Sequence, residues 1–227
     1  MTDIIKHHDF IELDYTGMLL DGTIFDTTQK SVAEQHHQGH THDQKYKPAT
    51  VCVGEQQLLP GFDVQLEGKE IAKEYTIALK PEEAFGKRDI KKVKIVPTST
   101  FKEHNLQPHP GLRINVDGEM GTITSISGGR VIVNFNHPLA GKEVQYAFTI
   151  RRKITDPKEQ IMAFLQTSLR LPPENINVTI AENKAHVALP MNFPKPFLDA
   201  VGKKLVELTN LEEVAVHAVQ KTTEQKQ

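Results

Sequence analysis

The segment FNHPLAGK, residues 135–142, divides the chain into its parts. Its last six residues combine proline and glycine in the composition of a turn. Two runs typical of strands precede it, 122–127 and 130–135, and Gly128-Gly129 between them favours a hairpin. Residues 146–154 read as a strand after it, and the basic run 151–153 suggests that this strand lies at an edge. The turn therefore separates two bodies of β-structure.

Residues 90–136, on the N-terminal side of this turn, read as a small β-rich module. Val93, Ile95 and Val96 favour a strand, and residues 99–104 favour a short helix. A loop with two prolines leads from this helix into the predicted hairpin. The stretch has the elements of a separate small domain.

The first 89 residues alternate between strand and turn signals. Asp21-Gly22 predicts a hairpin in which Leu19 and Leu20 pair with Ile24 and Phe25. Residues 27–48 are polar and rich in histidine, with room for one short helix. Strands are predicted at 11–16, 49–54 and 75–79, and an amphipathic helix at 58–67.

Residues 155–219 predict a separate α+β unit with the order αββαβ. Its first helix has a strong start, with acidic Asp156 at the cap, Pro157 in the first turn and Glu159 three residues after the cap. A unit of this size has a small core, which favours burial against a partner.

Composition excludes several classes of protein. The 227 residues carry 29 acidic and 27 basic side chains, a formal net charge of −2, which gives no reason to expect a nucleic-acid partner. No apolar run approaches the roughly 20 residues that span a bilayer, and the first ten residues lack the apolar core of a signal peptide. The single cysteine, Cys52, excludes an internal disulfide and fits a reducing cytoplasm. No phosphate-binding loop or nucleophile motif is present.

Four short segments and one tyrosine follow one another along the chain: 14–17 (DYTG), 25–26 (FD), 58–62 (LLPGF), 82–86 (EEAFG) and Tyr146. This series resembles the FKBP-type peptidyl-prolyl cis-trans isomerases. The segment 135–142 is similar to the SlyD-like branch, in which an insert-in-flap domain interrupts the FKBP domain. The C-terminal unit resembles the extension of its long archaeal members, a looser likeness.

The resemblance implies an α+β fold: an FKBP-like antiparallel half-barrel around one short helix, a small inserted β-rich domain and a C-terminal α+β domain. It implies an isomerase domain at 1–89 and 137–154, a chaperone insert at 90–136, and a C-terminal domain with a tail at 155–227. The prolyl pocket would be lined by Tyr15, Phe25, Asp26, Leu58, Leu59, Phe62, Phe85 and Tyr146.

Two pocket positions depart from the family pattern. Phe85 stands where many members have a tyrosine that donates to the substrate carbonyl, and Phe62 stands where single-domain members have tryptophan. Isomerisation needs no nucleophile and no cofactor, because the barrier of about 18–20 kcal/mol is amide resonance. An apolar pocket disfavours the planar amide relative to the twisted one. We therefore expect the activity to survive these two changes.

The insert has more apolar residues than a core of its size can bury. In SlyD-like proteins this domain binds unfolded chains, so the resemblance implies unfolded proteins with X–Pro bonds as partners. The residues assigned to substrate capture are Ile95, Val96, Phe101, Leu112, Met120 and Ile123.

A histidine cluster is the candidate metal site. His36, His37, His40 and His42 place four imidazoles within seven residues, a pattern that chelates nickel, copper or zinc. Such clusters also bind metal adventitiously, so a regulatory and an adventitious role both stay open.

Three alternatives remain at this stage. The chain could be a holdase with a vestigial prolyl pocket, which the changes at Phe62 and Phe85 would favour. It could be a metal-handling protein, which the histidine cluster would favour. The C-terminal unit could form a homodimer through strands at 178–180 or 214–218.

Overall fold

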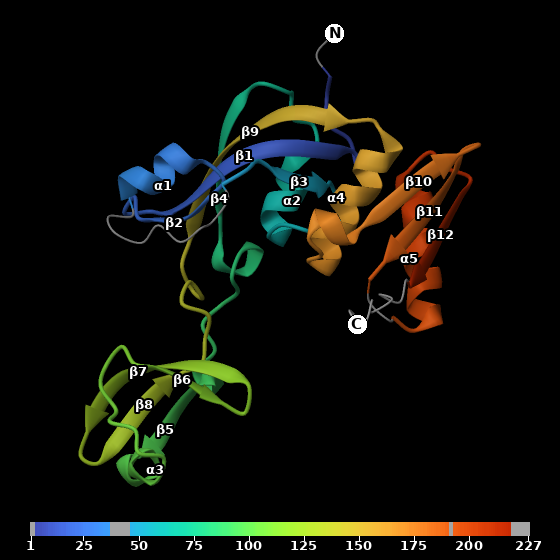
Figure 1. Ribbon diagram of the computed structural model, residues 1–227. Coiled ribbons are helices and arrows are strands. Elements are labelled where there is room, and N and C mark those ends of the chain that lie inside the picture. Colours follow the sequence, from blue (N-terminus) through green and yellow to red (C-terminus); the bar gives the residue numbers. More distant parts are fainter. Residues whose placement is uncertain (1–2, 37–45, 191–192, 219–227) are drawn as a thin grey trace. The chain divides into compact units, whose positions relative to one another are not determined.

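The computed structural model describes residues 3–36, 46–190 and 193–218 (Figure 1). The chain forms two compact units, one made of residues 1–78 and 145–227 and the other of residues 79–144. The fold is α+β with mainly antiparallel sheets and few helices, as the sequence predicted.

The first unit is built on a five-stranded sheet. Its strands are β1 (Phe10–Leu19), β2 (Ile24–Thr27), β3 (Ala49–Cys52), β4 (Glu74–Leu79) and β9 (Val144–Ile154). The order is β2-β1-β9-β4, and β3 also pairs with β1, next to its N-terminal half. The predicted short helix is α1 (Lys30–His36).

The hairpin of β1 and β2 has a different register from the one predicted. Met18 lies opposite Ile24 and Gly17 opposite Asp26, with an irregularity between them. Leu19, the last residue of β1, instead bonds Thr23: its N–H donates to the Thr23 carbonyl, and its own carbonyl accepts from the Gly22 N–H. The predicted pairing of Leu19 and Leu20 with Ile24 and Phe25 is therefore wrong.

Strand β9 lies inside the sheet, so the predicted edge position is also wrong. Its basic run, although largely exposed, pairs with acidic side chains in and next to β1. Arg151 pairs with Asp14, Lys153 Nζ lies 2.7 Å from Asp9, and Arg152 Nη2 lies 2.8 Å from Glu12. Charge complementarity between the neighbouring strands explains a basic run that resembles an edge signal.

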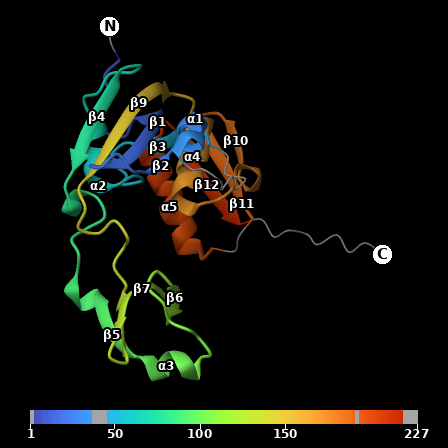
Figure 2. The same ribbon diagram turned by 90° about the vertical axis from the view of Figure 1, so that its left-hand side faces the viewer.

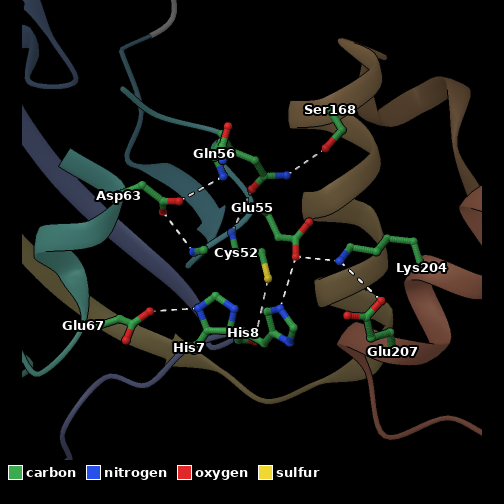
Figure 3. A network of polar contacts seen from close by, with 12 residues as sticks. His7, His8, Cys52, Glu55, Gln56, Asp63, Glu67, Ser168, Lys204 and Glu207 are labelled. Atoms are coloured by element: carbon green, nitrogen blue, oxygen red, sulfur yellow. Dashed lines mark hydrogen bonds and ion pairs between the residues drawn. The ribbon is translucent and has the colours of Figure 1, made fainter. Parts of the chain in front are cut away.

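Helix α2 (Pro60–Leu66) follows β3 through a turn held by one buried carboxylate. Asp63, 3% exposed, accepts the N–H of Gly54 at 3.1 Å and that of Gln56 at 2.9 Å (Figure 3). Pro60 starts the helix with its preset φ, and Gly68 follows its end at a φ of 77°. The turn between β3 and α2 is thus tied to the helix it precedes.

The C-terminal part has the predicted order αββαβ. Its elements are α4 (Pro157–Leu169), β10 (Asn177–Ala181), β11 (Lys184–Leu189), α5 (Lys195–Leu208) and β12 (Glu213–Ala218). Asp156 caps α4 as expected, accepting from the N–H groups of Lys158 and Glu159. Strands β11 and β12 are parallel, and α5 between them packs against β12 (Figure 1, Figure 2).

The C-terminal helices are anchored to the turn after β3. Gln57 Nε2 donates to Ser168 Oγ of α4 at 2.8 Å, and Lys204 Nζ of α5 lies 2.8 Å from Glu55 (Figure 3). The apolar core of this part also contains Phe10 and Cys52 from β1 and β3. The C-terminal elements and the first sheet therefore share one core.

The second unit has a four-stranded sheet and one helix. Its strands are β5 (Val93–Pro97), β6 (Arg113–Val116), β7 (Glu119–Ser127) and β8 (Arg130–Asn134), and its helix is α3 (Thr98–Glu103). The order is β5-β8-β7-β6, and β6 was not predicted. Short 3-10 helices lie at Pro81–Glu83 and Ile90–Lys92, and a third, in the first unit, at Pro173–Asn175.

Removing the Asp63 carboxylate should destabilise the protein strongly. In Asp63→Ala two backbone N–H groups lose their acceptor, and we expect the free energy of unfolding to fall by about 2–4 kcal/mol. Urea unfolding measures this. The matched control is Glu67→Ala, whose exposed contact with His7 should contribute less than about 0.5 kcal/mol. Equal effects of the two changes would contradict the role of Asp63.

Candidate functional site

Four aromatic rings assigned to the pocket from the sequence lie together in the first unit. Tyr146 of β9 is at their centre, with its ring centroid 5.8 Å from Tyr15, 5.8 Å from Phe25 and 4.7 Å from Phe62. Phe62 and Tyr146 are almost fully buried, at 1% and 3% exposed. They form an apolar floor, and the partly buried rings of Tyr15 and Phe25 stand at its rim.

A carboxylate completes this cluster. The Tyr15 hydroxyl donates to Asp26 Oδ2 at 3.0 Å. Burial, followed by the charge of Asp26 and this hydrogen bond, raises the pKa of the Tyr15 phenol above its ordinary value. Burial and the same carboxylate also raise the pKa of Tyr146. Both phenols are therefore neutral donors over the physiological pH range, beside one exposed carboxylate.

An open groove of about 860 Å³ lies beside this cluster, within the first unit, and Tyr15, Asp26 and Leu58 line it. Leu59 directly precedes α2 and is partly buried, with its carbonyl accepting from the N–H groups of Phe62 and Asp63. The start of α2 thus places the predicted leucine pair next to the ring cluster.

Phe85 belongs to the second unit, whereas the other predicted pocket residues belong to the first. Its ring stacks on His137, with centroids 4.6 Å apart and planes 1° from parallel. The Gly141 N–H donates to the Gly86 carbonyl at 2.8 Å, which ties the segment after Phe85 to the turn that follows His137.

Sequence analysis missed three residues that shape the cluster. Phe148 lies 5.0 Å from Phe62, and Tyr75 stacks on Phe148 at 5.5 Å. The period-2 pattern of β9, which puts Phe148 on the face of Tyr146, could have revealed the first. Gly17 is the third, because a Cβ there would lie 2.8 Å from both Phe25 and Tyr146. Gly17 ends the segment 14–17 (DYTG) that carries the family resemblance, and this segment could have revealed it.

The six residues assigned to substrate capture divide by burial. Ile95 and Met120 are 63% and 57% exposed. Phe101 and Ile123 are 5% and 1% exposed and form the core with Val131 and Val133, so their assignment to a client-binding surface is wrong. Val96 and Leu112 are partly buried against that core. Exposed apolar side chains of this unit that the sequence analysis did not assign are Ile90, Leu106, Val116 and Ile126.

The predicted metal ligands fall mostly outside the described residues. His36 ends α1, whereas His37, His40 and His42 lie in the segment that is not described. Within the described ranges, no group of three histidine, cysteine or acidic side chains is arranged to hold a metal ion. In those same ranges, no helix has the length and apolar character needed to cross a membrane.

Two family models match the chain. The model described as FKBP-type peptidyl-prolyl cis-trans isomerase matches residues 2–102, and the model described as FKBP26, IF domain matches residues 94–139. The first range contains the ring cluster except Tyr146, and the second contains most of the four-stranded sheet.

Relatives support the same assignment. A short-type peptidyl-prolyl cis-trans isomerase of Methanocaldococcus jannaschii is 31% identical over 159 residues, covering 70% of this chain and 99% of that protein. A probable FKBP-type 16 kDa isomerase of Pseudomonas fluorescens is 35% identical, covering 44% and 68%. The isomerase SlyD of Haemophilus influenzae is 26% identical, covering 64% and 70%.

These matches and the ring cluster agree, and the chain belongs to the FKBP-type peptidyl-prolyl cis-trans isomerases. The residue types fit this chemistry, because a rotation about an amide bond needs an apolar surface and oriented hydrogen-bond donors.

The two phenols should make stability sensitive to alkaline pH. Below their ordinary pKa of 10.0, Tyr15 and Tyr146 are protonated in both the folded and the unfolded chain. Their contribution to the free energy of unfolding is then fully present. Above that pKa the unfolded chain ionises first, so stability falls as the pH rises towards the higher folded pKa. In Tyr146→Phe this fall should be shallower by roughly 1 kcal/mol per pH unit. Urea unfolding from pH 8 to 11 checks this, and parallel curves would contradict it.

Proposed function

We propose that this chain catalyses cis-trans isomerisation of X–Pro bonds in unfolded protein chains and also holds those chains as a chaperone. The observation that supports the catalytic part is the Tyr15–Asp26 hydrogen bond at the rim of a buried aromatic floor. A planar amide carries a resonance dipole that water solvates. The floor of Phe62 and Tyr146 offers the proline ring an apolar surface, which favours the twisted amide.

The departures from the family pattern are compatible with this activity. Phe62 keeps the floor apolar and packs closely against Tyr146 and Phe148. Phe85 cannot donate a hydrogen bond, but within the described residues the Tyr146 hydroxyl makes none, so it is available to a substrate carbonyl. This is the reason to favour an active enzyme over a holdase with a vestigial pocket.

We propose that the outer face of the four-stranded sheet captures clients. Ile95 of β5 pairs with Ile132 of β8, and these side chains point away from the core that the next pair faces, partly buried Val96 and buried Val131. Gly121 faces the core, since a Cβ there would lie 2.7 Å from Val133, so its neighbour Met120 points to the outer face. Ile95, Ile132 and Met120 therefore share one apolar face across three strands, which suits binding of unfolded chains.

We also propose a separate role for each part of the chain. We assign isomerisation to residues 1–89 and 137–154, client capture to a SlyD-like insert-in-flap domain at 90–136, and self-association to the long-type extension at 155–227. Strands β10 and β12 are the two edges of their sheet, which is the feature that supports homodimerisation. The buried free thiol of Cys52 supports a cytoplasmic location. Nickel, copper or zinc binding by the histidine cluster stays a prediction, as does a reaction without a required cofactor.

A peptide assay tests the catalytic proposal. A protease-free isomerisation assay on an X–Pro tetrapeptide should show acceleration by the wild type. Tyr15→Phe, which removes one hydrogen bond of about 1 kcal/mol, should lower kcat/KM about fivefold, and Asp26→Ala at least as much. Tyr75→Phe is the matched control, because this phenol only accepts from the Glu70 N–H. A wild type without activity that still suppresses client aggregation would establish the holdase instead.

Client capture is tested by removing the apolar face. Ile95→Ser combined with Met120→Ser should slow catalysed refolding of a proline-limited protein by about tenfold, because the local concentration of client at the pocket falls. Turnover of the tetrapeptide should stay at the wild-type rate. The control is Val64→Ser, which changes a still more exposed apolar residue of α2 in the first unit. If refolding and tetrapeptide turnover respond alike, the capture proposal fails.

A further inference from the structure

The groove next to the ring cluster extends well beyond the predicted prolyl pocket. The groove is lined by Tyr15, Asp26 and Leu58 and by β3 from Ala49 to Val51. One face of α4, from the C-terminal part of the chain, also lines it and is called the wall below. This face consists of Glu159, Met162, Ala163, Gln166, Thr167 and Arg170.

The length of this wall indicates what the groove can hold. The lining positions from Glu159 to Arg170, the residue directly after α4, are eleven steps apart along the chain, which corresponds to about 16 Å at 1.5 Å per residue. An extended polypeptide advances about 3.3 Å per residue, so the wall matches about five residues of extended chain. A proline and its direct neighbour would occupy only part of it.

Backbone pairing with β3 does not explain binding in this groove. The Thr50 carbonyl already accepts from Thr167 Oγ1 at 3.1 Å, and the Cys52 N–H already donates to Gln57 Oε1 at 2.8 Å. These side chains occupy backbone groups that an added strand would need. Recognition must therefore come from side chains of the walls.

Apart from Asp26, whose carboxylate accepts from the Tyr15 hydroxyl and has no ion pair among the described residues, the unpaired charges that line the groove are positive. The carboxylates of Glu12 and Glu159 both bind Arg152, and these contacts lower the pKa of Glu159. Among the described residues, Arg170 and Lys47 line the groove without an ion pair. Arg170 directly follows α4, and its backbone has a left-handed φ of 52°. Its side chain lines the groove from this position.

Hydrogen bonds and ion pairs join the α4 wall to the first sheet. Thr167 and Ser168 bind the β3 region, and Arg152 of β9 joins Glu12 of β1 to Glu159 at the start of the helix. The elements that line the groove are thus hydrogen-bonded to one another within one compact unit. Preorganised walls reduce the entropy lost when a flexible chain binds.

We propose that this groove is a second substrate subsite, which holds an extended segment flanking the isomerised proline and prefers segments with acidic side chains. The proposal rests on the isomerase function proposed above. It gives the C-terminal part a role in substrate choice, through Arg170 at the groove wall.

Binding of labelled peptides to the full chain tests this subsite. The probes are eleven-residue peptides with a central X–Pro bond and glutamate, glutamine or lysine at the positions three to five residues from it on both sides. Fluorescence anisotropy at low salt should give the wild type the tightest Kd for the glutamate peptide, about threefold below the glutamine peptide. Arg170→Asn, which tolerates the left-handed φ, should remove this preference, and Arg170→Glu should reverse it towards lysine.

Lys203→Asn on α5 is the matched control and should keep the wild-type order of affinities. An unchanged glutamate-to-glutamine ratio in both Arg170 variants overturns the proposal. So does a failure of every peptide to bind the wild type, whatever oligomeric state light scattering shows. Tetrapeptide turnover, measured in parallel, reports on the isomerase itself, so the failure of one proposal is distinguishable from the failure of the other.

Discussion

The buried carboxylate of Asp63 is the interaction on which the first unit depends. It binds two N–H groups of the turn between β3 and α2, at Gly54 and Gln56. The residues of this turn reach in two directions. Glu55 and Gln57 reach the C-terminal helices, while Leu58 and Leu59 lead into the floor of the pocket. A charged acceptor holds a turn more firmly than a neutral one, and the cost of leaving its donors unpaired keeps it in one conformation.

Much of the fold could be predicted from the sequence because the deciding patterns are local. The strand signal of β1, the amphipathic run of α2 and the cap at Asp156 each act within a few residues, and each element is found in the structure. Burial does not alternate along β1, because Asp14 and Thr16 are buried as well as Ile11 and Leu13. The rings at Tyr15, Phe25, Phe62 and Tyr146 also come together as predicted. The ordered resemblance to a family was needed to assign these rings to a pocket. Periodicity alone could not do so, because aromatic residues on strands usually belong to the hydrophobic core.

The failures concern properties that depend on distant partners. The basic run of β9 resembled an edge because its acidic partners on β1 lie about 140 residues earlier in the chain. Phe101 and Ile123 could not be separated from Ile95 and Met120, because burial in a small sheet depends on which face meets α3. Asp63 had no distinctive neighbours in the sequence, and its importance comes only from the turn that it binds.

The neighbouring position of β1 and β9 has a consequence for the order of events during synthesis. The first sheet cannot be completed until residue 154 has left the ribosome, because its two central strands are separated by the whole second unit. That second unit is continuous in sequence, from 79 to 144, and its pairings are mostly between nearby strands. Local contacts form faster than distant ones. The second unit can therefore fold before β9 pairs with β1 and completes the first sheet.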